Sequence, residues 1–201
     1  MSPPLQRAAA PVEAGAVAIV HSRQDREAAV RTWLLVAAQD AKEAQTQWRE
    51  SGTALLRCGG VFGAIRISAA LVRAAAGTDN TRTIDTFLTE ALQGGPVFMD
   101  QYAGRYYVLV PASTGQRPVW TSHRGPEAEF LGRDCFLGVP RPETTEPEGV
   151  RSYWCVPMDG PGALADPGEV FRLLSSARHR RTQEERDPMQ AAAPRCAPYR
   201  N

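Results

Sequence analysis

The chain has 201 residues and a mass of 21.9 kDa, and 43% of its residues are apolar, which allows one domain with a sizeable core. This composition excludes a wholly disordered, collagen-like or disulfide-scaffold protein. The 23 basic and 22 acidic residues nearly cancel, which excludes a strong overall field acting on a polyanion. Lys42 is the only lysine, so arginine carries almost all of the positive charge.

The first 20 residues are rich in Ala and Pro and lack the basic and apolar regions of a secretory signal. We therefore expect a poorly ordered segment over 1–20 and a cytoplasmic protein. No apolar stretch is long enough to span a membrane, so we expect no membrane contact. From Ser22, a capping-box pattern and apolar residues at helical spacing predict one helix of about seven turns that Gly52 ends.

Two short apolar runs, residues 53–57 and 61–67, flank the paired glycines Gly59-Gly60. This pattern predicts two strands joined by a tight turn. Ser68 then caps a short helix that Gly77 ends. A second short helix is expected from about Thr83 to Gly94.

Residues 96–100 and 106–110 flank a turn and predict a hairpin. Further strands are expected at 135–139 and 152–157, and Asp166-Pro167 predicts the start of a final helix. Beyond Ala177 the apolar periodicity ends. We therefore expect a single α+β domain over 21–176, with a mixed, mostly antiparallel sheet and helices on one face in two layers, and a disordered arginine-rich tail over 177–201.

The sequence offers little catalytic chemistry. The glycine-rich segment 58–63 lacks the Lys-Ser/Thr of a P-loop and does not match G-x-G-x-x-G before a helix, so a tight turn explains it. The four cysteines have no metal-ligand spacing, which predicts buried thiols. We therefore predict no metal, no cofactor and no catalytic residues.

Aromatic rings and arginines alternate in several of the expected strands. They predict either a stacking surface for nucleic acid or an alternation in which some rings fill the core. The residues are Tyr102, Arg105, Tyr106, Tyr107, Arg66 and Trp154. In the tail, Arg178, Arg180 and Arg181 form a second candidate for contact with nucleic acid or an acidic partner.

The near-neutral total charge hides a regional pattern. Residues 1–126 have a net charge of +3, residues 127–171 of −6 and residues 172–201 of +4. The acidic 127–171 segment therefore suggests an alternative function, a protein–protein interaction module that binds a basic partner.

Two glycine-led stretches, residues 57–77 and 95–111, resemble hairpins of the N-terminal primase–polymerase (Prim-Pol) domains. Residues 131–142 and 152–157 lie where that fold places further sheet strands. More narrowly, the chain is similar to a group of actinobacterial proteins found on or beside conjugative and integrative elements. The resemblance covers residues 25–175 and implies a Prim-Pol-like scaffold.

The chain departs from this family at the catalytic positions. Prim-Pol enzymes carry an acidic D-x-D-type pair on the strand after the glycine turn, where this chain has Arg66. They carry a histidine in the later hairpin, where this chain reads Gly104-Arg105-Tyr106-Tyr107. Without carboxylates there is no two-metal clamp for phosphoryl transfer.

We therefore expect a non-enzymatic accessory or regulatory protein, associated with DNA or with a replication or transfer protein of a mobile element. An enzyme of unknown class around Cys58, Asp100 and Tyr106 is the remaining alternative. The residues expected to contact nucleic acid or another ligand are Arg66, Arg105, Tyr106, Trp154, Arg178, Arg180 and Arg181.

Overall fold

The computed structural model describes residues 22–122 and 125–191. The segment 1–20 and the last ten residues of the expected tail lie outside the described residues. The helices are α1 (Arg23–Leu35), α2 (Ala41–Ser51), α3 (Ala69–Ala76), α4 (Thr81–Ala91), the 3-10 helix η1 (Ala112–Gln116), α5 (Pro118–Ser122) and α6 (Pro167–Ala191). The strands are β1 (Thr53–Arg57), β2 (Gly63–Ser68), β3 (Val97–Asp100), β4 (Arg105–Val110), β5 (Ala128–Leu131), β6 (Phe136–Pro140) and β7 (Ser152–Val156).

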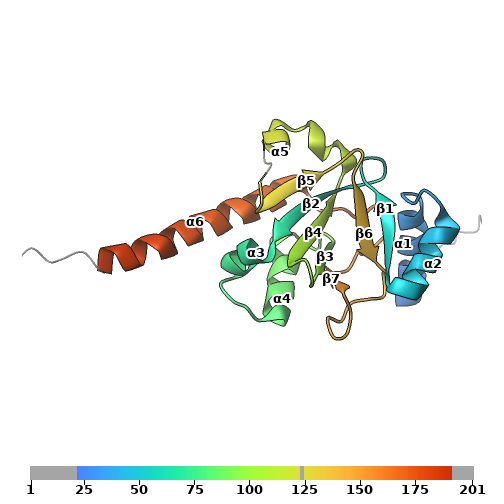
Figure 1. Ribbon diagram of the computed structural model, residues 1–201, viewed down its shortest axis with the longest axis horizontal. Coiled ribbons are helices and arrows are strands. Elements are labelled where there is room, and N and C mark those ends of the chain that lie inside the picture. The colour runs from blue at the N-terminus through green and yellow to red at the C-terminus, as the bar shows by residue number, and fades with distance from the viewer. Residues whose placement is uncertain (1–21, 123–124, 192–201) are drawn as a thin grey trace, which may run out of the picture.

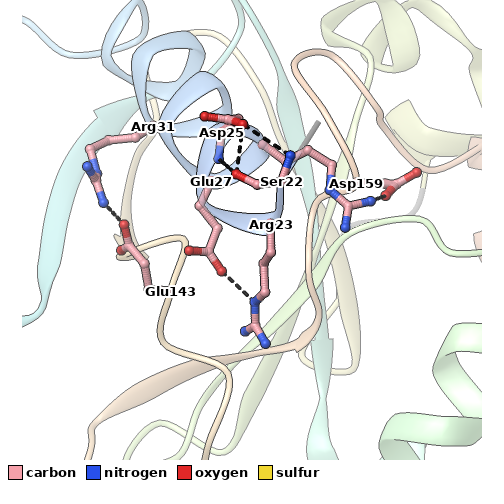
Figure 2. Close-up of polar contacts among 8 residues, drawn as sticks. Ser22, Arg23, Asp25, Glu27, Arg31, Glu143 and Asp159 are labelled. Atoms are coloured by element: carbon pink, nitrogen blue, oxygen red, sulfur yellow. Dashed lines mark hydrogen bonds and ion pairs between the residues drawn. The ribbon is translucent and has the colours of Figure 1, made fainter. Parts of the chain in front are cut away.

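The long N-terminal helix predicted from the sequence is in fact two helices, α1 and α2. The predicted capping box begins α1: the Ser22 hydroxyl accepts the Asp25 N–H, and the Asp25 carboxylate accepts the Ser22 N–H (Figure 2). Asp40 has an extended backbone and begins α2, where its carboxylate accepts the N–H groups of Lys42 and Glu43. The single-helix prediction was wrong because apolar periodicity continues across a break that Asp40 stabilises.

The strands form a five-stranded sheet in the order β5-β2-β4-β3-β7 and a two-stranded sheet of β1 and β6. Every pairing among the described strands is antiparallel. The expected α+β fold is confirmed. The predicted hairpin is also confirmed, because β3 and β4 pair antiparallel around a turn that ends at Gly104.

Both faces of the five-stranded sheet are covered (Figure 1). On one face, α3, α4 and α6 bury side chains at alternate positions along the strands, such as Ile65, Val108 and Tyr153. On the other face, the β1–β6 sheet and α1 pack on Ala64, Leu109 and their neighbours. This second cover gives the molecule a third layer that the two-layer expectation did not include.

The glycine-rich turn after β1 does not make a hairpin. β1 pairs with β6, whereas β2 pairs with β4 and β5, so the turn carries the chain from one sheet to the other. Gly59 has φ +90°, and a Cβ there would come within 2.6 Å of the Arg133 backbone. Glycine is therefore required for close packing against the 132–135 loop as well as for the turn.

The last helix is longer than predicted. α6 begins at Pro167 after Asp166, as expected, but it continues to Ala191. The structure places residues 177–191 in this helix rather than in a disordered tail: Ala177 is fully buried, and Arg180 and Arg181 contact the body of the molecule. Figure 1 shows the end of α6 extending away from the sheets.

Three elements between β4 and β6 were not predicted: η1, α5 and β5. They lie in a stretch rich in Gly, Pro and Thr, where local sequence signals favour loops. Among the described residues, no helix combines the length and hydropathy needed to cross a membrane.

Candidate nucleic-acid interface

A groove runs between the two sheets, where β1–β6 covers only part of the five-stranded sheet. Its cavity has a volume of about 560 Å³. The groove is lined by β1 and β6 of the smaller sheet and by strands of the larger sheet, and its lining includes both outward residues of β1–β6, such as Leu55, and the inward residue Leu137. The lining residues are Thr53, Leu55, Arg66, Asp100, Tyr107, Leu131, Cys135, Phe136, Leu137, Gly138, Arg151 and Ser152.

Tyr107 is the central aromatic side chain of this groove. It is half-buried and stacks on Phe98, with ring centroids 5.0 Å apart and an interplanar angle of 18°. Burial, and then the Asp100 carboxylate, raise the pKa of Tyr107, whereas three nearby arginines oppose this shift. The phenol is therefore protonated at neutral pH and available as a hydrogen-bond donor.

The three arginines around Tyr107, here called the arginine cluster, are Arg66, Arg105 and Arg151. Arg66 lies opposite Tyr107 in the β2–β4 ladder and donates to Glu129 at 2.5 Å. Arg151 donates to the Asp100 carboxylate at 3.1 Å. Arg105 lies opposite Asp100 in the β3–β4 ladder, and no ion pair of its guanidinium is found among the described residues. Arg105 is therefore the member of the cluster most available to an external anion.

Exposed apolar side chains border the arginine cluster. Leu55 and Phe136 on the outer face of β1–β6 are 54% and 42% exposed. Tyr102, in the β3–β4 turn, is 84% exposed, and the Arg151 guanidinium lies 5.9 Å from its ring centroid. The groove thus combines positive charge with solvent-exposed aromatic and aliphatic side chains.

The other two aromatic residues predicted to contact a ligand lie in the core. Tyr106 points to the opposite face of the sheet from Tyr107 and is buried against α3 and α4. Burial strongly raises its pKa. Trp154 is buried beneath the β1–β6 layer, where its indole N–H donates to the Arg141 carbonyl at 3.1 Å. For these two residues, the expectation of ligand contact was wrong and the alternative of core packing is correct.

The arginines of the predicted tail make contacts within the chain. Arg181 and Arg178 both form ion pairs with Glu127, which immediately precedes β5. Arg180 donates to the Ala75 carbonyl at 2.8 Å, at the C-terminal end of α3. These three guanidiniums attach α6 to the rest of the molecule, which reduces the charge available to a polyanion.

The residues of the enzyme alternative are not brought together. Cys58 and Tyr106 belong to core clusters on opposite faces of the larger sheet, and Asp100 is paired with Arg151. Burial, with a smaller effect of Cys135, raises the pKa of Cys58 to about 12. At neutral pH this thiol is therefore not an activated nucleophile.

The sequence did not identify Arg151, Leu55 and Phe136 as site residues. Leu55 lies in the uniformly apolar run Ala54-Leu55-Leu56, so no change of polarity marks it as the outward residue. Arg151 reaches the site only because β7 pairs with β3, a contact between distant segments. Arg66 and Arg105, which were predicted to contact a ligand, do lie together, and they lie beside Tyr107, the neighbour of the predicted Tyr106.

This chain matches no protein-family model, no curated protein and no solved structure. The resemblance to Prim-Pol domains therefore stays a prediction. What the chain binds must be inferred from the chemistry of the groove itself.

Proposed function

We propose that this chain is a non-catalytic accessory protein that binds single-stranded nucleic acid in the groove between its two sheets. The observation that carries the proposal is the arginine cluster around Tyr107, bordered by the exposed side chains of Phe136, Leu55 and Tyr102. Proteins that bind single strands combine guanidiniums for phosphates with aromatic platforms for bases.

The charge of the groove favours modest affinity. Arg66 and Arg151 already contact the carboxylates of Glu129 and Asp100. A phosphate therefore competes with these two carboxylates, and Arg105 offers the most accessible positive charge. Because a single strand exposes the faces of its bases, stacking adds affinity that a duplex does not gain.

The proposal of a non-catalytic role is supported by the surroundings of Arg66. In the resembled enzymes this strand holds the metal-binding carboxylates, whereas here Arg66 pairs with Glu129 on the neighbouring strand. Among the residues that the structure describes, no three His, Cys, Asp or Glu side chains group as metal ligands. The scaffold is thus suited to holding a strand rather than to extending one.

The test is binding of a fluorescein-labelled oligothymidylate, followed by fluorescence anisotropy at several salt concentrations. We expect Arg105→Glu to weaken binding by about tenfold and to reduce the salt slope by about one. Arg82→Glu, an equal change of charge on the exposed face of α4, is the matched control and is expected to leave the affinity unchanged.

A second variant tests the stacking component. Tyr102→Ala removes an exposed ring without disturbing the core and is expected to weaken binding with unchanged thermal stability. Equal losses in the Arg105 and Arg82 variants would assign binding to net charge alone. No binding at low salt would overturn the proposal.

A further inference from the structure

Cys58 and Cys135 face each other at the end of the β1–β6 ladder. The last assigned pair of the ladder is Arg57 with Phe136, so the next positions outward are the two cysteines. The Cys58 N–H donates to the Cys135 carbonyl at 2.9 Å, which shows that the pairing continues to this position. Residues directly opposite in antiparallel strands have Cα atoms about 4.5–5.5 Å apart, within the range that a disulfide bridges.

The two thiols also lie on the same side of the two-stranded sheet. Cys58 lies two residues after Leu56, which points inward, and Cys135 lies two residues before Leu137, which also points inward. Because side chains two residues apart in a strand share a face, both cysteines point inward. Both cysteines pack in the core cluster beneath this sheet, and both are free thiols. Directly opposite side chains on one face approach within about 5 Å at Cβ, so a bond between them requires little backbone movement.

The loops that carry the two cysteines are held against each other. The absence of a side chain at Gly59 lets the turn after Cys58 pack directly on the backbone of Arg133. This contact places the two segments together before any bond forms. A disulfide would therefore fix an arrangement that the fold already has.

The two thiols differ in their access to solvent. Cys58 is 1% exposed, whereas Cys135 is half-buried and lines both the groove and a neighbouring cavity next to η1. A small reagent therefore reaches Cys135 first. The burial that raises the pKa of Cys58 makes its subsequent attack slow at neutral pH.

We propose that Cys58 and Cys135 form a reversible redox pair that low-molecular-weight disulfides oxidise. The Cys135 sulfur attacks one sulfur of the small disulfide, forming a mixed disulfide and releasing one small thiol. The Cys58 sulfur then attacks the Cys135 sulfur and expels the second small thiol. Each protein thiol gives its proton to a released thiol, and the two electrons reduce the small disulfide.

This proposal is independent of nucleic-acid binding, and its test needs no nucleic acid. The native full-length protein is incubated with oxidised glutathione, quenched with acid and digested for peptide mapping by mass spectrometry. We expect a mixed disulfide on Cys135 first, then a linked peptide that joins Cys58 and Cys135. An excess of reduced glutathione is expected to restore both thiols.

Two variants make the result specific. Cys135→Ser is expected to abolish the linked peptide, whereas Cys155→Ser, at a buried thiol in the opposite core cluster, is expected to leave it unchanged. Mapping of the unsubstituted chain decides the matter even if a variant folds poorly. A mixed disulfide that persists on Cys135 while Cys58 stays free, or a linkage that excludes either residue, would overturn the proposal.

Discussion

Tyr106 and Tyr107 have opposite surroundings because successive side chains of β4 point to opposite faces of the sheet. Tyr106 is buried with α3 and α4, whereas Tyr107 lies among arginines in the groove. Both faces of β4 are covered over most of its length, so its sequence shows no alternation of polarity. Which of the two tyrosines faces the groove therefore depends on where the β1–β6 layer ends.

A substitution at Trp154 tests whether this side chain stabilises the core rather than contacting a ligand in the groove. Trp154→Phe removes the indole N–H that serves the Arg141 carbonyl and leaves unfilled volume beside Phe98. We expect the free energy of unfolding to fall by about 1–3 kcal/mol, measured by urea denaturation. Tyr102→Phe, at an exposed ring, is the control and is expected to change it by less than about 0.5 kcal/mol. A large loss of oligonucleotide affinity in the folded Trp154 variant would contradict its assignment to the core.

Asp85 gives the stability of the protein a dependence on pH. Its carboxyl lies half-buried on α4 and accepts a long hydrogen bond of 3.4 Å from the Tyr153 hydroxyl, and burial raises its pKa above 3.8. The pKa of Asp85 is higher in the folded chain than in the unfolded chain, so the protonated carboxyl stabilises the fold. This contribution to stability is complete below pH 3.8 and is lost as pH rises through the folded-state pKa.

Asp85→Asn keeps an acceptor for the Tyr153 hydroxyl but cannot ionise. We therefore expect the melting temperature of the variant to exceed that of the unsubstituted chain at pH 7, with a difference that narrows toward pH 4. Thermal unfolding followed by circular dichroism across this range measures the effect. Parallel pH profiles of the melting temperatures of the two proteins would show that Asp85 is not the source of the pH dependence.

Between elements, the arginines and carboxylates of the chain pair across long distances in the sequence. Five of the nine acidic residues in the fully described 127–171 segment form ion pairs with arginines distant in the sequence, and Glu169 pairs with Arg172 within α6. Figure 2 shows one of them, between Arg31 of α1 and Glu143. The regional charges are therefore largely complementary within the molecule, and the segment offers less free charge to a basic partner than its composition suggests.

The contact of Arg180 with α3 is a specific example of how α6 is attached. Arg180→Ala leaves the Ala75 carbonyl without its charged donor at a helix C-terminus, and we expect a loss of about 1 kcal/mol in unfolding free energy. Chemical denaturation measures this loss, and Arg172→Ala, which removes an exposed local ion pair with Glu169, is expected to leave stability unchanged. Reduced oligonucleotide affinity in the Arg180 variant, with stability unaltered, would instead assign the tail to ligand binding.

The ends of α3 were predicted correctly from local signals, whereas the pairing of β1 with the distant strand β6 was not. Ser68 and Gly77 set the ends of α3 through contacts within a few residues, so their sequence pattern suffices. The pairing of β1 with β6 is decided by burial of their shared apolar face, which no local pattern around the glycine turn reveals. The groove follows from that pairing, so the sequence indicated Arg66 and Arg105 but not the wall opposite them.

For the whole molecule, the near-zero net charge limits how strongly salt affects binding. If the three guanidiniums of the arginine cluster replace counterions on a single strand, the logarithm of the affinity is expected to fall with the logarithm of salt with a slope of about −2. Titrations of oligothymidylate at a series of sodium chloride concentrations give this slope. A value steeper than about −4 would mean that arginines outside the groove take part.

The pairing of Thr53 with Pro140 and of Arg57 with Phe136 has a consequence for biosynthesis. A ribosome completes α1, α2 and β1 long before it has made the strand that pairs with β1. During that interval the edge of β1 that later pairs with β6 has unpaired backbone N–H and C=O groups, which are a template for pairing with other chains. Release of β6 from the ribosome is thus the event that closes the third layer, and any truncation upstream of residue 136 leaves that layer without its second strand.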